Sequence, residues 1–286
     1  MSRFSGLQHF LSEIATAMLF QDFPSLFMAA EKLNETFQSN FSSAPDWSSI
    51  NLWIDQLQET NKCWDPLVTV SAVHKELELL NLKKAPGSDG ISPRLLFAGR
   101  DVLAPVLAHL ISLSIEKRQI PKLWKSANIV PVPKKRNPTM KDIRPISLLP
   151  IVGKICEKLV LSSVKEQLIE SYGNEQFGFR PKSSTTLSHI SIHNFITENL
   201  DKSTVNGVLL ISLDMSRAFD SLSHEALMKT ICSTDLPKGF IQWCANYLQN
   251  RQQKVIIEQV SSNSIEVSSG VPQGSTLAPF LFCVQI

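Results

Sequence analysis

Residues 208–220, which read Val-Leu-Leu-Ile-Ser-Leu-Asp-Met-Ser-Arg-Ala-Phe-Asp, constrain the fold of this chain most strongly. Residues 208–213 are apolar except for Ser212, and Asn206-Gly207 precede them. A short apolar run entered through turn residues predicts a buried β-strand rather than a helix. Asp214 follows directly, and a carboxylate at the end of a buried strand is costly unless it is paired or holds a metal. The segment predicts a rigid strand with one acid at its tip; an ordinary turn or helix-cap aspartate is the alternative.

Charge is unevenly distributed along the 286 residues, although the net charge is only +2. Residues 1–82 carry 4 Lys/Arg against 10 Asp/Glu, whereas residues 117–182 carry 14 Lys/Arg against 5 Asp/Glu. A basic segment in a near-neutral chain indicates a local site for a polyanion such as nucleic acid. A solvated basic surface is the alternative.

Hydrophobic periodicity predicts a chain of mixed helices and strands. Residues 1–65 carry amphipathic helical patches but no pattern that indicates chemistry. Further helices are expected over 70–82, 101–118, 151–171, 183–201, 227–231, 240–248 and 277–282, strands over 127–133 and 142–149, and a hairpin over 254–267. Prolines in the 127–133 strand confine it to a sheet edge or a hairpin arm.

Several short stretches carry residue types that suit phosphate or nucleic-acid contacts. Lys134-Lys135-Arg136 follow the 127–133 strand, and Arg144 lies among apolar neighbours, where a guanidinium usually meets a carboxylate or a phosphate. Residues 84–91 and 269–275 are Gly- and Pro-containing loops with exposed backbone amides, although such loops are more often simple turns.

The cysteine pattern and hydropathy bear on the compartment. The five cysteines are scattered and contain no Cys-x-x-Cys pair, so they support neither a zinc ribbon nor a disulfide framework. No apolar run reaches membrane-spanning length, and no signal peptide is recognised at the N-terminus. We expect an intracellular protein, in the nucleus or the cytoplasm, with no membrane association.

Six collinear stretches then point to one family. They are Lys-Ala-Pro-Gly-Ser-Asp-Gly-Ile at 84–91, Pro-Lys-Leu-Trp-Lys at 121–125, Ile-Arg-Pro-Ile-Ser-Leu-Leu-Pro at 143–150, Gln-Phe-Gly-Phe-Arg at 176–180, Leu-Asp-Met-Ser-Arg-Ala-Phe-Asp at 213–220 and Gly-Val-Pro-Gln-Gly-Ser at 270–275. Together they resemble the reverse transcriptase domain of non-LTR (LINE-like) retrotransposons of the jockey-like kind.

The resemblance implies an α+β right-hand polymerase with fingers, palm and thumb, and an antiparallel palm sheet. The implied activity is RNA-directed DNA polymerisation, in which two Mg²⁺ ions assist nucleotidyl transfer. The implied partners are an RNA template, a DNA primer and dNTPs, with no obligate protein partner.

The resemblance also assigns roles to individual residues. Asp214 resembles the first metal-binding aspartate, beside the backbone carbonyl of Met215. The residues that resemble nucleotide contacts are Lys134 and Arg144 at the triphosphate, Phe219 as a steric gate under the sugar, and Gln273 and Gly274 in the loop that lines the nucleotide pocket.

Template contacts are implied for two stretches. The first is the loop that contains Lys84 and Gly87. The second is the turn that contains Phe177, Gly178 and Arg180, where aromatic and basic side chains suit base stacking and backbone binding.

One departure from the family pattern limits these expectations. The family's second catalytic strand carries a Tyr/Phe-Ala-Asp-Asp turn, but no two of the 11 aspartates here are adjacent. We therefore expect a helical extension (1–65), a fingers-like region (66–206) and a partial palm (207–286), truncated before the Ala-Asp-Asp motif, without a thumb and inactive by itself. A catalytically dead nucleic-acid-binding remnant is the alternative.

Overall fold

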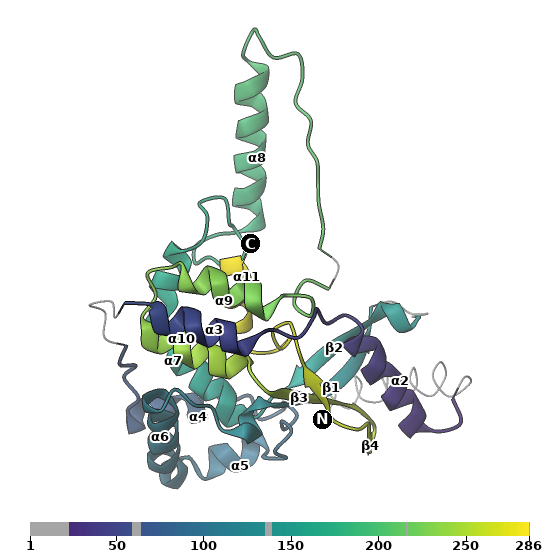
Figure 1. Cartoon of the computed structure of the whole chain (residues 1–286), viewed down its shortest axis with the longest axis vertical. Coiled ribbons are helices and arrows are strands. Elements are labelled where there is room, and N and C mark those ends of the chain that lie inside the picture. The colour runs from purple at the N-terminus through teal and green to yellow at the C-terminus, as the bar shows by residue number, and fades with distance from the viewer. Residues whose placement is uncertain (1–22, 59–63, 135–138, 216, 286) are drawn as a thin grey trace.

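The computed structural model describes residues 23–58, 64–134, 139–215 and 217–285 (Figure 1). The helical patches expected within residues 1–22, and the basic residues Lys135 and Arg136, lie outside the described residues. The description that follows concerns the remaining residues.

A mixed sheet with the strand order β2-β1-β3-β4 lies at the centre of these residues. β1 (Ser126–Pro133) pairs antiparallel with β2 (Ile143–Leu148) and parallel with β3 (Arg251–Ile257). β3 also pairs antiparallel with β4 (Val260–Ser261) and β5 (Ile265–Val267). The expectation of a purely antiparallel sheet is therefore wrong. β3 is parallel to β1 because the strand direction is reversed twice, once between β1 and β2 and again between β2 and β3.

The prolines of β1 lie where the strand has one neighbour only. β3 pairs with β1 from Ser126 to Ile129, whereas Pro131 and Pro133 lie opposite β2 alone. A proline there removes no hydrogen bond from the β1–β3 ladder. The predicted hairpin arm is therefore confirmed. The hairpin predicted over 254–267 is present with different bounds, because β3 begins at Arg251, pairs with β4 directly after a turn that follows Ile257, and pairs with β5 through residues 251–253.

The predicted helices are also confirmed, with shifts at their ends. The helices of the described residues are α2 (Leu26–Gln38), α3 (Trp47–Gln56), α4 (Val70–Glu78), α5 (Pro93–Ala98), α6 (Arg100–Glu116), α7 (Ile151–Glu170), α8 (Thr185–Leu200), α9 (His224–Cys232), α10 (Lys238–Leu248) and α11 (Ala278–Gln285), with 3₁₀ turns at Lys122–Lys125 and Met140–Asp142. Ser223 caps α9, because its hydroxyl accepts a hydrogen bond from the Ala226 amide. No helix in this part of the chain is long and apolar enough to cross a membrane.

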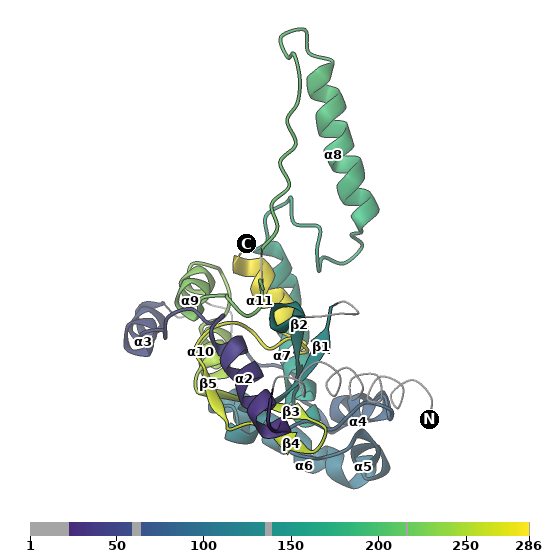
Figure 2. The same ribbon diagram turned by 90° about the vertical axis from the view of Figure 1, so that its right-hand side faces the viewer.

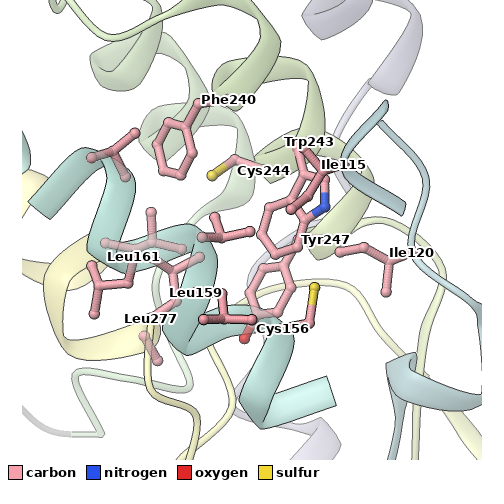
Figure 3. Close-up of a cluster of buried hydrophobic side chains, with 14 of the residues drawn as sticks. Ile115, Ile120, Cys156, Leu159, Leu161, Phe240, Trp243, Cys244, Tyr247 and Leu277 are labelled. Atoms are coloured by element: carbon pink, nitrogen blue, oxygen red, sulfur yellow. The ribbon is translucent and has the colours of Figure 1, made fainter. Parts of the chain in front are cut away.

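Two hydrophobic clusters hold these elements together. The larger one joins α7, α10 and α11, and Figure 3 shows Trp243 and Tyr247 of α10 with their rings nearly parallel, 5.6 Å apart between centroids. The smaller one lies between α2 and the sheet and contains Leu33, Phe37 and Val255. α2 is therefore attached to the sheet rather than to the main helical layer.

The strand predicted for residues 208–213 is not present. This segment is extended but pairs with none of the described strands, and Leu209 and Leu213 are 83% and 91% exposed. It runs beside α8, which projects from the rest of the molecule and buries no residue (Figures 1 and 2). An apolar run predicts burial, but a strand also needs neighbouring strands for its backbone hydrogen bonds. Among the described residues no element supplies them.

A buried carboxylate connects three of the helices. Glu157, on α7, accepts hydrogen bonds from the Ser275 hydroxyl (2.6 Å), the Thr276 amide (2.7 Å) and the Tyr247 hydroxyl (3.2 Å). The amide of Leu277 adds a longer contact at 3.3 Å. These amides precede α11, where free N–H groups favour a negative charge. Glu157 therefore holds the start of α11 against α7 and α10.

We expect Glu157→Ala to lower the free energy of unfolding by about 3 kcal/mol or more, because it leaves several buried donors without an acceptor. Urea denaturation measures this quantity. Glu166→Ala, on the exposed side of the same helix, is the matched control and should change the unfolding free energy by less than about 0.5 kcal/mol. Equal stability of the two variants would contradict the role given to Glu157.

Candidate functional site

The loop 269–275 lies between two segments that are distant in sequence. On one side it meets the turn 217–222, because the Gly270 amide donates to the Leu222 carbonyl (2.7 Å) and the Val271 amide donates to the Phe219 carbonyl (2.8 Å). On the other side it meets β2, because the Ser147 amide donates to the Gln273 carbonyl (2.9 Å). The loop therefore joins the turn to the sheet.

Two glycines make this close approach feasible. Gly270 has a φ of +82°, and a Cβ there would lie 2.6 Å from the Phe219 carbonyl oxygen. Gly274 has a φ of +124°, and a Cβ there would lie 2.8 Å from the Ser147 carbonyl oxygen. A side chain at either position would separate the loop from its neighbour. Glycine is thus required where the backbones touch.

A pocket of about 200 Å³ opens beside this loop. Four of the five residues predicted to bind nucleotide line it together: Lys134, Arg144, Phe219 and Gln273. They come from the end of β1, from β2, from the turn 217–222 and from the loop 269–275. The remaining lining residues are Thr36, Phe37, Asn40, Met140, Ile143, Pro145, Arg217, Ala218 and Asp220.

The described lining of this pocket is rich in positive charge. Lys134, Arg144 and Arg217 contribute three cations, whereas Asp220 contributes one carboxylate. Burial raises the pKa of Asp220, and the hydrogen bond from Gln273 Nε2 to Asp220 Oδ1 (2.8 Å) and the charges of Arg217 and Lys134 oppose that rise. Such a cationic hollow suits a ligand with several negative charges.

An aromatic partner fixes the ring of Phe219 at the pocket wall. The Phe219 ring stacks on Phe282 of α11, with centroids 4.9 Å apart and planes at 28°. Offset stacking of this kind restricts the ring to one orientation. Phe219 therefore presents a held, flat surface to the pocket.

Asp214 and Met215 do not line the pocket. Both are exposed and follow the extended segment 208–213. Arg217 follows Asp214 by three positions, which limits the distance between their Cα atoms to about 11 Å. Within the described ranges no group of three His, Cys, Asp or Glu side chains is placed to hold a metal. One carboxylate and one carbonyl do not fit a two-Mg²⁺ centre, which needs several hard oxygen ligands.

Gly274 and the first predicted template loop meet at a second groove, of about 460 Å³, on the far side of the loop 269–275. Lys84 lines it together with Lys154 and Lys158 of α7. Burial lowers the pKa of Lys154, the Lys84 charge lowers it further, and Glu157 opposes the shift. Lys158 is paired with Glu76, whereas neither Lys84 nor Lys154 forms a salt bridge with a carboxylate of the described residues. Gly87 packs against Leu149 and Pro150, where a Cβ would clash with backbone atoms.

The second predicted template stretch lies elsewhere. Arg180 donates to the carbonyls of Asn174 (3.4 Å) and Ile169 (3.5 Å), so its guanidinium covers the C-terminal end of α7. Phe177 and Gly178 lie in the same turn and line neither of the two hollows described above. The structure therefore brings the nucleotide candidates together but separates the template candidates into two places.

Sequence reasoning missed some lining residues. Arg217 lies within the stretch 213–220 that resembles the family, two residues before Phe219. Its closeness to Phe219 in the sequence could therefore have indicated that it lines the same pocket. Thr36, Phe37 and Asn40 gave no such signal, because periodicity identifies the buried face of a helix but not the element that the helix meets.

A buried histidine links α9 to the loop 269–275, which we call the glycine loop. His224 is 1% exposed and lies with Nε2 2.7 Å from the Gly270 carbonyl oxygen. Burial lowers its pKa to about 4, Arg251 acts in the same direction, and the hydrogen bond to Gly270 opposes the shift. The neutral imidazole therefore donates to Gly270 in the folded protein.

Comparisons with known proteins agree with the geometry. Residues 132–286 match the family described as "Reverse transcriptase (RNA-dependent DNA polymerase)". The chain is 32% identical over 222 residues to the "RNA-directed DNA polymerase from mobile element jockey" of Drosophila melanogaster, and 30% identical over 224 residues to the protein of that name from Drosophila funebris. It is 29% identical over 222 residues to the "Probable RNA-directed DNA polymerase from transposon BS" of Drosophila melanogaster. These alignments cover 76–77% of this chain but only 24% of each relative.

We expect acid to destabilise the fold through His224. Its folded-state pKa of about 4 lies below the ordinary value of 6.5, so the unfolded chain takes up a proton first and stability falls as the pH drops from about 6.5 towards 4. Between pH 7 and pH 5 the free energy of unfolding should fall by about 2 kcal/mol for this reason. Urea denaturation at both pH values measures it.

His224→Gln keeps an N–H donor but does not titrate. Between pH 7 and pH 5 the free energy of unfolding of this variant should therefore fall by about 2 kcal/mol less than that of the wild type. His109→Gln, at an exposed position, is the control and should keep the wild-type pH dependence. An unchanged pH dependence in His224→Gln would show that His224 is not the titrating group.

Proposed function

This chain belongs to the reverse transcriptase (RNA-dependent DNA polymerase) family, and we propose its function on that basis. In this proposal the chain supplies the nucleotide-binding and template-binding part of the RNA-directed DNA polymerase of a non-LTR retrotransposon. The observation that carries the proposal is the pocket in which Lys134, Arg144, Phe219 and Gln273 meet, although they are spread over 140 positions of the sequence.

Each wall of this pocket suits one part of a deoxynucleoside triphosphate. Lys134, Arg144 and Arg217 bind the phosphates, since a guanidinium fits phosphate oxygens through two parallel hydrogen bonds. Phe219 lies under the sugar, where its ring excludes a 2′-hydroxyl by volume and so favours dNTPs over ribonucleotides. Gln273 and Gly274 form the edge of the pocket towards the second groove.

Asp214 and the Met215 carbonyl are proposed as two ligands of the family's divalent ions, and a two-ion centre would need further oxygen ligands beside them. Divalent ions supply the charge that stabilises the attacking and leaving oxygens in nucleotidyl transfer. Because the described residues contribute one exposed carboxylate, no step of the reaction is derived from them. Nucleotide and nucleic-acid binding without catalysis is the second candidate, and the exposed position of Asp214 favours it.

The template strand is assigned to the groove on the other side of the loop 269–275. Lys84 and Lys154 form no salt bridge there, and the half-buried Lys154, whose pKa burial lowers, would gain from an anionic ligand. Gln273 faces the nucleotide pocket and Thr276 faces the groove, so a template base and an incoming nucleotide would meet at the loop between them. The turn that contains Phe177, Gly178 and Arg180 remains a candidate for a more distant template contact.

We expect Arg144→Ala to weaken the binding of dTTP by about 10–100-fold, because a charged hydrogen bond to phosphate contributes about 1.5–3 kcal/mol. Isothermal titration calorimetry of the chain with dTTP and Mg²⁺ measures the dissociation constant. Arg94→Ala, at an exposed position outside the pocket, is the matched control and should bind dTTP as the wild type does. Equal affinities of Arg144→Ala and Arg94→Ala would rule out the nucleotide role of the pocket.

We also expect single-stranded RNA to bind with a log–log salt slope on the order of −3, as for about four phosphate contacts. Lys154→Ala should make this slope shallower by about one unit, because each lysine–phosphate contact releases about one counterion. Fluorescence anisotropy across a salt series measures the slope. Lys229→Ala, on the exposed face of α9, is the control. A Lys154→Ala slope equal to that of the control would remove the groove from the template path.

A further inference from the structure

Asp220 is the one carboxylate among the described residues that line the pocket proposed for the nucleotide. It shares this lining with the cations of Lys134, Arg144 and Arg217. A nucleotide brings several negative charges into the pocket, and a neighbouring carboxylate repels them. On charge alone the pocket would therefore bind phosphates more tightly without Asp220, so its side chain must serve the pocket in another way.

The surroundings of Asp220 do not favour its negative charge. Burial raises the pKa of Asp220 in spite of the opposing charges of Arg217 and Lys134. A raised pKa means that the ionised carboxylate loses more by leaving water than its neighbours give back. Among the described residues neither of these cations forms a salt bridge with Asp220. Neutralisation of the pocket cations therefore does not explain why a carboxylate lies here.

The side chain of Asp220 makes one hydrogen bond with the described residues, and its partner is Gln273. Gln273 Nε2 donates to Asp220 Oδ1 over 2.8 Å, and both residues line the pocket. A carboxylate can only accept hydrogen bonds, so it selects the Nε2 end of the carboxamide. Oε1 of Gln273 accepts no hydrogen bond from the described residues and is not one of their buried unpaired atoms, so it stays accessible.

The backbone holds Asp220 in a fixed place. Its carbonyl accepts from the Ser269 hydroxyl (2.9 Å), and its amide donates to the Arg217 carbonyl (2.9 Å). Gly270 lies so close that a Cβ there would be 2.8 Å from the Asp220 Cα. On the other side, the Gln273 carbonyl accepts from the amide of Ser147 in β2. The hydrogen bond between Asp220 and Gln273 therefore joins two segments that are each held, which restricts the carboxamide to one orientation.

We propose that Asp220 is a positioning residue, whose carboxylate holds the Gln273 carboxamide in the orientation in which it binds the incoming deoxynucleotide. A glutamine that is already ordered loses no further side-chain entropy when the nucleotide arrives, and this gain outweighs the repulsion between Asp220 and the phosphates. The inference rests on the proposed function of the pocket. It gives a role to the last residue of the stretch 213–220, to which the resemblance assigns none.

The test is a double-mutant cycle of Asp220→Ala and Gln273→Ala. Isothermal titration calorimetry of the whole chain with dTTP and Mg²⁺ measures the four dissociation constants. Asp220→Ala should raise the dissociation constant by a factor that is about threefold to tenfold larger when Gln273 is present than in the Gln273→Ala background. The repulsion between Asp220 and the phosphates acts in both backgrounds, so it cancels in this ratio. Equal factors in the two backgrounds overturn the positioning role.

A conservative variant separates the hydrogen bond from the charge. Asp220→Asn and Asp220→Ala both lack the negative charge, but asparagine keeps an acceptor oxygen of the same reach. Asp220→Asn should therefore bind dTTP at least about threefold more tightly than Asp220→Ala, and this difference should disappear in the Gln273→Ala background. Equal affinities of the two variants beside an intact Gln273 would show a purely electrostatic role and overturn the proposal.

The control removes a carboxylate elsewhere on the molecule. Asp65 is exposed and lies outside the pocket, so Asp65→Ala should bind dTTP as the wild type does. If Asp65→Ala changes the affinity for dTTP as much as Asp220→Ala does, the effect comes from the overall charge of the chain, and the positioning role is overturned.

Failure of the proposed function has a different signature. If Arg144→Ala binds dTTP as tightly as the wild type, or if the wild type does not bind dTTP, the pocket is not a nucleotide site and the role of Asp220 falls with it. If Arg144→Ala weakens the binding of dTTP while the cycle shows no coupling between Asp220 and Gln273, the pocket stands and only the role of Asp220 is overturned.

Discussion

The buried carboxylate of Glu157 is the interaction on which the position of the candidate site depends. It accepts from Ser275, Thr276 and Tyr247, and so joins the start of α11 to α7 and α10. A buried charge is stable only when such donors surround it, which makes the arrangement specific as well as stabilising. Because residues 270–274 precede these amides directly, their path is fixed at one end by Glu157 and at the other by the contacts of Gly270 with the turn 217–222.

The glycine loop divides the cationic surface into two hollows with different chemistry. On one side Gln273 faces Asp220, Arg144 and the ring of Phe219; on the other side Gly274 and Thr276 face Lys84 and Lys154. A side chain at position 274 would collide with β2, so at this point the backbone of the loop lies directly against the strand. The close packing of Gly274 against β2 is thus a constraint on the path of the loop.

The resemblance assigns nucleotide roles to Lys134, Arg144, Phe219 and Gln273, which lie in short separate stretches, and the structure brings these residues together in one pocket whose nucleotide role is a proposal. The sequence predicts poorly where the outcome depends on a distant partner. The burial expected for residues 208–213 needs neighbouring strands, which the described residues do not provide, and the approach of Asn40 to the pocket depends on the docking of α2 through Asn34. Neither condition can be inferred from the sequence of the segment alone.

The pocket proposed to bind the nucleotide and the proposed metal ligand Asp214 lie in parts of the chain that are held in place by different contacts. The pocket is held by contacts among α2, β2, α11 and two loops, in which Asp214 has no part. Asp214 is connected to the pocket through the two residues that precede Arg217, and it follows a run of exposed apolar side chains. Exposed leucine and isoleucine in such a run favour association with a further apolar surface. The position of the proposed metal ligand therefore depends on whatever covers residues 208–213, whereas the pocket proposed for the nucleotide is formed without that contact.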